Sequence, residues 1–405
     1  MRFPEFSGEW ESCKLRSIGY AYNGLSGKSG SDFGVGAPFI TYKSVFDNSK
    51  IDIRRTGLVT ITEQERLKHS QNIVRKGDAF FTISSETPEE VGMSSVLLDD
   101  IDDCYLNSFC FGYRPTSNSV TSDYLRYYLR SPKLRKKIMI LAQGSTRFNI
   151  SKDEVLNLTV SLPSLDEQNK IARTLDLIEE RIETQIKIIE ELKTLRGALV
   201  DTYINDGNNN NENQTIMSLG AYGCFVRGLT YSSVDVTDNT ATTGVVRSNN
   251  LEYGNPVDIK TDLVYVTKKP SPEQMLVNGD IVICMANGSS SLVGKASNYQ
   301  ELCRNMTVGA FCGIYRGTHP LTKWIFMSSA YCKAVANAIQ GGNGAIANLH
   351  AEDILSMCFA VPSDYKTITE LGKLLSLFDE KLHAAEEQLA RFIEQKKYFL
   401  FKMFI

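Results

Sequence analysis

The sequence predicts a mixed α+β protein built from two copies of one domain, each followed by a long helix. The first observation is that the two halves of the chain align at an offset of roughly 200 residues, far longer than any solenoid period. The second is that both halves contain short apolar runs ended by turn residues, which are typical of strands. The third is that each half ends in a helical stretch whose apolar residues repeat about every 3.5 positions.

Length and composition agree with two domains. A chain of 405 residues, 42% hydrophobic and 22% charged, is long enough for two cores. The net charge of −3 neither favours nor excludes nucleic acid, because binding needs only a local basic face. The first residues, "MRFPEFSGEWESCK", lack the apolar core of a signal peptide, no apolar run reaches the length of a membrane span, and the nine cysteines include no Cys-x-x-Cys pair. We therefore expect a cytoplasmic protein with reduced thiols and no membrane contact.

The alignment of the two halves sets the expected domain boundaries. The string "NIVRKGDAFFTISSETPEEVGMSS" matches "QMLVNGDIVICMANGSSSLVGKAS", which places Gly77–Asp78 opposite Gly279–Asp280. Downstream, "NLTVSLPSLDEQ" matches "SMCFAVPSDYK", so Pro163 falls opposite Pro362. The tract "NDGNNNNENQT" is polar and reads as a linker. The expected parts are a first domain at 1–164, a first helical region at 165–204, a linker at 205–215, a second domain at 216–363 and a second helical region at 364–405.

Several local elements follow from the same patterns. The strings "GDAFFTIS", "LTVSLP", "DIVICMA" and "MCFAVP" predict short strands, and the Gly-Asp pairs predict tight turns before two of them. The string "TSDYLRYYLRSPKLRKKIMILAQG" predicts a helix capped by Ser122 or Asp123 and interrupted near Pro132.

The two long helices carry matching heptad patterns. Steps of four and three residues from Ile171 and from Leu371 land on large apolar side chains except at Gln185 and Arg196 in the first helix and at the equivalent Ala385 and Lys396 in the second. A lone helix would leave such a stripe in water, so we predict an intramolecular antiparallel coiled coil; two separate helices, each on its own domain, remain the alternative. The predicted seam residues are Ile171, Leu175, Ile178, Ile182, Ile189, Leu192, Leu199, Leu371, Leu375, Phe378, Leu382, Leu389, Phe392 and Phe399.

With these helices included, the whole chain resembles the specificity subunit of Type I restriction-modification systems. The resemblance rests on "LPSLDEQNKIARTLDLIEERIETQIKIIEELK" and "VPSDYKTITELGKLLSLFDEKLHAAEEQLARFIEQKK", and on "QGSTRFNIS" near the end of the first domain. The second helical region departs from the family pattern, because Asp364, Tyr365 and Lys366 stand where an acidic residue and Gln are usual.

The resemblance implies a non-catalytic DNA-binding role without a cofactor. In such a subunit, two target-recognition domains each read one half of a bipartite, asymmetric site on double-stranded DNA. The coiled coil acts as a spacer and as a docking surface for two methyltransferase subunits, and restriction subunits join through the complex.

The residues themselves leave weaker alternatives. The glycine-rich loop and Asn/Asp-Pro-Pro-Tyr/Phe string of a base-flipping methyltransferase do not occur. "GLSGKSG" suggests a phosphate loop, but Tyr22 occupies the position of its first glycine. The acidic string "LLDDIDDCY" suggests Mg²⁺, yet no nuclease pattern follows it. A coiled-coil scaffold that binds protein partners without DNA is the main alternative.

Candidate DNA contacts are polar and basic loop residues, because base edges and phosphates are bound by such side chains. The helix around Pro132 adds six basic residues that could follow phosphates or form a solvated face or a subunit contact: Arg126, Arg130, Lys133, Arg135, Lys136 and Lys137. The predicted DNA-binding residues are Lys43, Ser44, Arg54, Arg55, Ser84, Ser85, Thr87, Arg147, Arg247, Ser248, Asn249, Asn250, Asn287, Ser289, Ser290 and Asn343.

Overall fold

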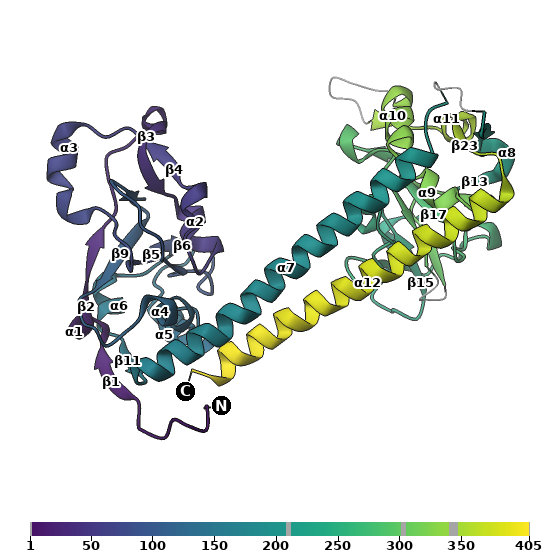
Figure 1. Ribbon diagram of the computed structural model, residues 1–405. Coiled ribbons are helices and arrows are strands. Elements are labelled where there is room, and N and C mark those ends of the chain that lie inside the picture. The colour runs from purple at the N-terminus through teal and green to yellow at the C-terminus, as the bar shows by residue number, and fades with distance from the viewer. Residues whose placement is uncertain (1, 208–211, 301–304, 340–346, 405) are drawn as a thin grey trace. The chain divides into compact units, whose positions relative to one another are not determined.

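The computed structural model describes residues 2–207, 212–300, 305–339 and 347–404 (Figure 1). The chain forms two compact units. Unit 1 contains Met1–Ile186 and Glu387–Ile405, and unit 2 contains Lys187–Glu386. Among the residues that the structure describes, every helix is too short or too polar to span a bilayer.

Unit 1 is built around a four-stranded antiparallel sheet in the order β2-β9-β5-β7. Unit 1 also contains a three-stranded sheet, β4-β3-β8, in which β3 and β8 are parallel. The strand pairs β1-β11 and β6-β10 form two further small sheets. The strands are β1 (Glu11–Lys14), β2 (Gly19–Asn23), β3 (Phe33–Ile40), β4 (Gly57–Val59), β5 (Ala79–Thr82), β6 (Ser84–Ser85), β7 (Ser94–Val96), β8 (Tyr105–Leu106), β9 (Cys110–Pro115), β10 (Phe148–Asn149) and β11 (Thr159–Leu162). The short helices are α1 (Leu15–Ile18), η1 (Gly30–Asp32), α2 (Tyr42–Asp47), η2 (Ile53–Arg55), α3 (Glu63–Lys68), η3 (Ser70–Asn72), α4 (Ser122–Tyr128), α5 (Pro132–Ile140) and α6 (Lys152–Leu156).

Unit 2 repeats this plan. Its central sheet has the order β13-β21-β17-β19, the second sheet is β14-β16-β15-β20 with β15 and β20 parallel, and the pairs are β12-β23 and β18-β22. The strands are β12 (Gln214–Ser218), β13 (Gly223–Arg227), β14 (Val236–Thr237), β15 (Thr243–Val246), β16 (Val264–Val266), β17 (Ile281–Cys284), β18 (Ala286–Asn287), β19 (Ala296–Asn298), β20 (Met306–Val308), β21 (Cys312–Gly317), β22 (Ala347–Asn348) and β23 (Cys358–Pro362). The short helices are α8 (Leu219–Tyr222), η4 (Ser233–Asp235), η5 (Ser248–Asn250), η6 (Pro272–Gln274), η7 (Ser290–Leu292), α9 (Thr322–Ile325), α10 (Ser329–Ala338) and α11 (Ala351–Ser356).

The Gly-Asp turns are confirmed, and each holds a buried ion pair. Gly77 and Gly279 have φ of 89° and 93°, a conformation that glycine adopts without strain. The aspartate that follows each glycine accepts two hydrogen bonds from one arginine of the central sheet: Arg114 binds Asp78 at 2.7 and 2.6 Å, and Arg316 binds Asp280 at 2.8 and 2.7 Å.

The interrupted helix is confirmed, but its predicted cap is wrong. Helix α4 is capped by Thr121, whose extended backbone lets its hydroxyl accept a bond from the Tyr124 amide. Ser122 and Asp123 lie in the first turn instead, where the Asp123 charge favours the positive end of the helix dipole. Helix α5 restarts with Pro132 at its first position, as proline prefers.

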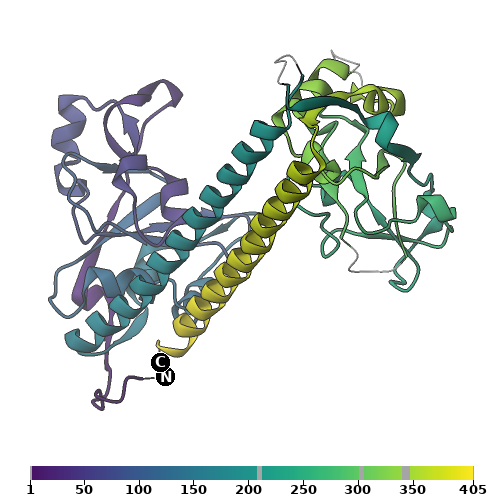
Figure 2. The same cartoon turned by 45° about the vertical axis from the view of Figure 1, so that its right-hand side comes forward.

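The two long helices pack antiparallel within each unit, which confirms the predicted fold class. They are α7 (Leu165–Tyr203) and α12 (Tyr365–Lys402), drawn teal and yellow in Figures 1 and 2. In unit 1, Glu179 of α7 meets Lys396 of α12, and in unit 2, Lys193 meets Glu386. The residue numbers of the contacts therefore decrease along α12 as they increase along α7, as expected for helices that run in opposite directions.

The predicted seam residues all lie on sheltered positions of the two helices. Their first turns reach the domain cores: Ile171 and Leu175 join the core of unit 1, and Leu371 and Leu375 join that of unit 2. The buried seam residues are Ile171, Leu175, Ile178, Ile189, Leu192, Leu371, Leu375 and Leu382. The half-buried ones are Ile182, Leu199, Phe378, Leu389, Phe392 and Phe399.

The Glu-Gln pair of the first helical region anchors α7 to unit 1. The Gln168 side chain accepts a bond from the Thr121 amide and donates to the Ser119 carbonyl, while Glu167 pairs with Arg2 at 2.6 Å. These contacts give the motif a structural reason. Helix α12 begins differently, because Asp364 accepts a bond from the Thr367 amide at 2.8 Å.

Candidate nucleic-acid interface

Several of the predicted DNA-binding residues of unit 1 come together on one surface, formed by α2, β6 and β10 and here called surface 1. The Tyr42 hydroxyl donates a 2.7 Å bond to the Ser84 carbonyl, which holds α2 against β6. Ser85 pairs with Phe148 across the two short strands, which brings Arg147 beside them. Surface 1 therefore gathers the predicted residues Lys43, Ser44, Ser84, Ser85, Thr87 and Arg147.

The side chains of surface 1 differ in exposure. Lys43, Thr87 and Arg147 are exposed, and Lys43 pairs with Asp47 of its own helix. Ser44 is half-buried beside the Thr41 hydroxyl that caps α2. Ser84 and Ser85 are buried because β6 continues directly from the buried strand β5. The last two are therefore placed to shape the surface rather than to meet a base.

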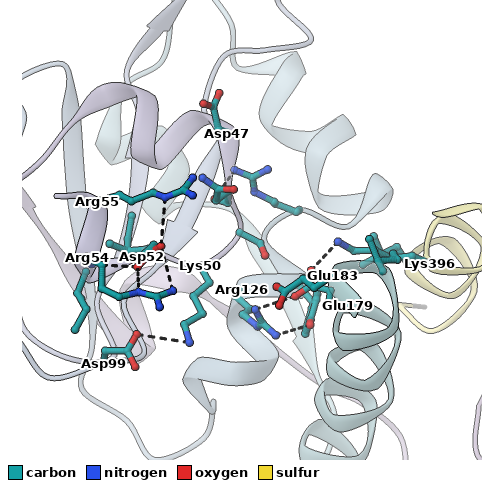
Figure 3. Close-up of a pocket in the computed structure, with 18 residues that line it drawn as sticks. Asp47, Lys50, Asp52, Arg54, Arg55, Asp99, Arg126, Glu179, Glu183 and Lys396 are labelled. Atoms are coloured by element: carbon teal, nitrogen blue, oxygen red, sulfur yellow. Dashed lines mark hydrogen bonds and ion pairs between the residues drawn. The ribbon is translucent and has the colours of Figure 1, made fainter. Parts of the chain in front are cut away.

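Arg54 and Arg55 lie away from surface 1. They sit in η2, are 86% and 88% exposed, and both pair with Asp52 (Figure 3). Both line a cavity of unit 1 instead.

The predicted residues of unit 2 gather on a corresponding surface, formed by η5 and β18 and here called surface 2. Arg247 and Asn249 both bind Asp262, at 3.2 and 2.5 Å. The Asn287 amide donates to the Ser248 hydroxyl at 3.3 Å, which joins η5 to β18. Surface 2 therefore contains Arg247, Ser248, Asn249 and Asn287, with the exposed Ser289 and Ser290 following in the chain.

Asn250 and Asn343 are the remaining predicted residues of unit 2. Asn250 is 1% exposed, accepts a bond from the Arg247 amide and donates to the Thr261 carbonyl, so its side chain is used within the turn. Asn343 lies outside the described residues.

An exposed phenylalanine beside each surface was missed from the sequence. Phe109 and Phe311 are 59% and 67% exposed and hold the third position of equivalent turns. The Phe109 carbonyl accepts a bond from the Ile83 amide, one residue before β6, and the Phe311 carbonyl accepts from the Met285 amide, one residue before β18. An apolar residue next to a strand resembles a core residue in sequence, and only the equivalent positions in the two halves could have marked these two.

The three arginines of the basic helix, for which phosphate contacts, a solvated face and a subunit contact were open alternatives, all make contacts within unit 1. Arg130 donates to the carbonyls of Ser94, Val45, Phe46 and Asn48, at 2.6 to 3.0 Å. Arg135 donates in the same way to the carbonyls of residues 89, 91 and 92. Burial lowers the pKa of both arginines to about 10, which still leaves them charged at neutral pH. Arg126 is 7% exposed and pairs with Asp176 and Glu179 of α7.

Arg126, Glu179 and Lys396 form a charged group, cluster 1, at a cavity of about 680 Å³ in unit 1 (Figure 3). One carboxylate oxygen of Glu179 lies 3.1 Å from Arg126 of α4, and the other accepts a 2.6 Å bond from Lys396 of α12. Arg126 also pairs with Asp176 and lies 4.3 Å from the ring centroid of Tyr127. Glu179 thus joins α4 to both long helices.

Lys323, Asp379 and Arg196 form the equivalent cluster 2 in unit 2. One oxygen of Asp379 accepts a 2.6 Å bond from Arg196 of α7, and the other pairs with Lys323 of α9. Lys323 lies 4.6 Å from the ring centroid of Trp324. The cavity here is only about 80 Å³.

The lysine of the possible phosphate loop is already engaged. Lys28 is 7% exposed and pairs with Glu65 at 2.6 Å. Within the described ranges, no three His, Cys, Asp or Glu side chains converge as a metal site requires.

Comparison with known proteins agrees with this architecture. Residues 8–194 match the family model described as the Type I restriction modification DNA specificity domain. This part of the chain is similar to that family, and the predicted resemblance to Type I specificity subunits is confirmed.

Particular relatives support the same assignment. The chain is 28% identical over 192 residues to the type I restriction enzyme EcoKI specificity subunit of Escherichia coli K12, covering 45% of this chain and 40% of that one. It is 24% identical over 282 residues to the StySPI specificity subunit of Salmonella potsdam, covering 65% and 57%. The matched region thus spans about half the length of these relatives. The fold resembles that of the Type I restriction-modification S subunit from M. genitalium, with a TM-score of 0.56 and 15% identity over 100% of this chain and 99% of the other.

Proposed function

We propose that the chain is the DNA sequence-specificity subunit of a Type I restriction-modification complex. Unit 1 and unit 2 each read one half of a bipartite, asymmetric DNA site through surface 1 and surface 2. The long helices space the two half-sites and dock two methyltransferase subunits, through which restriction subunits join. The subunit itself is non-catalytic and acts in the cytoplasm, where it meets the chromosome.

The observation that carries this proposal is the duplication of a domain whose first copy matches the model of the specificity domain. The two copies share sheet order, Gly-Asp turns and charged clusters, but their surfaces carry different side chains. Surface 1 presents Lys43, Thr87 and Arg147, whereas surface 2 presents Arg247, Asn249 and Asn287. Because base contacts specify sequence while the scaffold only positions them, a shared scaffold with different surfaces supports two different half-sites.

The helices support the docking role through their outward faces. Long helices normally turn their apolar residues inward, so exposed apolar side chains favour a protein partner. Unit 1 exposes Leu177, Ile186, Ile393, Tyr398 and Phe401 on its helix segments, and unit 2 exposes Ile188, Leu195, Leu374 and Leu377. Both units therefore offer an apolar face, which suits one methyltransferase subunit each.

Methylation sequencing tests the proposal in a host that carries the chain and its methyltransferase. The expected result is one methylated motif with two unlike halves and an unread spacer, absent from a host with the methyltransferase alone. Replacing residues 1–164 by the first domain of another specificity subunit should change one half only. A motif with identical halves, or a change in both halves, would contradict the reading by separate units.

The salt dependence of DNA binding separates this function from a protein scaffold. Phosphate contacts release counterions, so the affinity of the assembled complex for a duplex carrying the motif should fall steeply with salt. A scaffold without DNA contacts would show no sequence preference and no such slope.

A further inference from the structure

Both long helices carry a basic residue at an equivalent position of a mostly apolar seam. In α7 this residue is Arg196 and in α12 it is Lys396. A charge among apolar seam residues costs stability unless it is paired, so its occurrence in both copies calls for a partner. The partners are Asp379 and Glu179, which lie on the opposite long helix in each case.

Each of these carboxylates has a second cation, supplied by the domain of its own unit. Arg126 of α4 contacts Glu179, and Lys323 of α9 contacts Asp379. Both cations are followed directly by an aromatic residue whose ring they contact, Tyr127 and Trp324. The two clusters therefore repeat the same three parts: a cation on a domain helix, an acid on the helix that follows that domain, and a cation on the other long helix.

The chemistry of the two clusters is complementary rather than identical. In cluster 1 the domain supplies arginine, which spans two carboxylates because Asp176 is added to Glu179. In cluster 2 the domain supplies lysine, Ser376 stands at the place of Asp176, and the arginine comes from α7. A guanidinium with several donors thus occurs once in each cluster, at the place where a second acceptor is present. The second acceptor of Arg196 is the Gly254 carbonyl.

The clusters are sheltered enough to restrict orientation. The acids are 18% and 21% exposed and the most buried cations 8% and 10%. Exposed ion pairs contribute little, but a sheltered carboxylate that loses one partner leaves the other charge uncompensated. Rotation of the domain about its helix pair would break two contacts together in each unit. In unit 1 these are the contacts of Arg126 with Glu179 and Asp176. In unit 2 they are the Lys323–Asp379 pair and the bond from Arg196 to the Gly254 carbonyl.

We propose that Glu179 and Asp379 are positioning residues that hold each recognition domain at one orientation on its pair of helix segments, and thereby restrict the DNA site to one spacer length. This inference rests on the proposed function. It also assigns a role to the basic seam residues that the docking and reading surfaces leave unexplained.

The test compares Glu179→Gln and Asp379→Asn with two matched controls. The controls, Glu180→Gln and Glu380→Gln, remove a charge from the neighbouring, exposed position of the same helix. Each full chain is produced with its methyltransferase, and methylation sequencing scores genomic sites that have both half-sites and spacers of the native length or one base pair shorter or longer. Thermal unfolding of each purified complex is measured in parallel.

The expected result is a relaxed spacer without a change of the bases read. Both cluster variants should raise methylation at the neighbouring spacer lengths by about tenfold over the controls, since coupled contacts of this kind are worth about one such factor. Glu179→Asp, which keeps the charge but shortens the side chain, should relax the spacer less. If one variant chain does not accumulate, the variant of the other cluster and Glu179→Asp still decide the question.

Three outcomes would overturn the inference or its basis. Folded cluster variants that keep a single spacer, even with a lowered melting temperature, would show a purely stabilising role. Altered half-site bases with an unchanged spacer would place the residues at the reading surfaces instead. If the wild-type chain itself yields no bipartite motif, the proposed function fails first, and this is distinguishable from failure of the positioning role alone.

Discussion

Unit 1 and unit 2 repeat one topology but fill the space beside their clusters differently. In unit 2 the loop between η5 and β16 is bound to α7 and to the start of α10, because Arg196 donates to the Gly254 carbonyl at 3.1 Å and Tyr253 donates to the Ser328 carbonyl at 2.9 Å. In unit 1 the matching loop carbonyl, that of Asn48, is bound by Arg130 at 2.7 Å. The cavities of about 80 and 680 Å³ reflect this difference.

A duplicated contact thus persists in both units while its surroundings change. Arg130 precedes the cap of α5 in unit 1, and Met327 holds the matching place before α10 in unit 2. The guanidinium that binds this loop therefore comes from α7 in unit 2 and from the turn between α4 and α5 in unit 1, while each unit keeps its charged cluster. Four predictions use this comparison.

The largest expected effect is on the buried ion pair of the central sheets. Asp78 accepts bonds from Arg114, from the Tyr22 hydroxyl at 2.6 Å and from the Arg75 amide at 2.8 Å, so Asp78→Ala should lower the free energy of unfolding by about 3–5 kcal/mol. Asp280→Ala should cost less, because Val226 replaces the tyrosine and Arg316 is 31% exposed, against 12% for Arg114.

Hydrogen exchange resolved by unit measures this loss. Asp100→Ala is the control, since Asp100 is 84% exposed and solvent screens its pair with Lys76. Equal losses for Asp78→Ala and Asp280→Ala would contradict the comparison.

The next effect concerns equivalent seam residues at the two cavities. Leu382 is 4% exposed beside the small cavity, so Leu382→Ala should cost about 2–5 kcal/mol. Ile182 is half-buried and lines the large cavity, so Ile182→Ala should cost clearly less because part of its side chain already faces open space. Chemical denaturation of both variants gives the difference, and a larger loss for Ile182→Ala would argue against an open cleft in unit 1.

A smaller effect on binding is expected from the exposed phenylalanines. Phe109→Ala and Phe311→Ala should leave stability within about 0.5 kcal/mol, as for other surface changes. If these rings stack on bases, each variant should weaken binding of the complex to its own half-site by about 1–3 kcal/mol. Fluorescence anisotropy with duplexes altered in one half measures this. Leu67→Ala, which changes a residue 75% exposed, is the control, and an equal effect of all three would dismiss the phenylalanines as contacts.

The smallest effect is the acid sensitivity of cluster 1. Burial alone raises the pKa of Glu179, but the charges of Lys396 and Arg126 outweigh it and hold the pKa below the ordinary 4.5. A lowered pKa stabilises the folded state fully above the unfolded value, and this stabilisation is lost as pH falls through the folded pKa. The free energy of unfolding, measured from pH 6 downward, should therefore fall less steeply below about pH 4.5 in Glu179→Gln than in Glu180→Gln. Coincident curves for the two variants would contradict this prediction.

Much of the fold could be predicted from the sequence, because repeated local patterns report it directly. The Gly-Asp turns require a glycine that tolerates positive φ, and the helix seams follow from one period. Arg130 and Arg135 were misplaced because a run of charges resembles a solvated face, whereas their partners are backbone carbonyls that no sequence pattern reveals. Ser84, Ser85 and Asn250 were misplaced for a related reason: polarity indicates a hydrogen bond but not whether its partner is internal.

The distribution of the cluster residues has a consequence for how such a chain could arise. Helix α7 carries Glu179 for its own unit and Arg196 for the other, and α12 likewise carries Asp379 and Lys396. Every copy of the repeat therefore encodes both the acceptor it needs and the donor its sibling needs. A gene duplication would have supplied both contacts at once, and a recombined domain would be compatible with either half of the gene if it kept a cation followed by an aromatic residue.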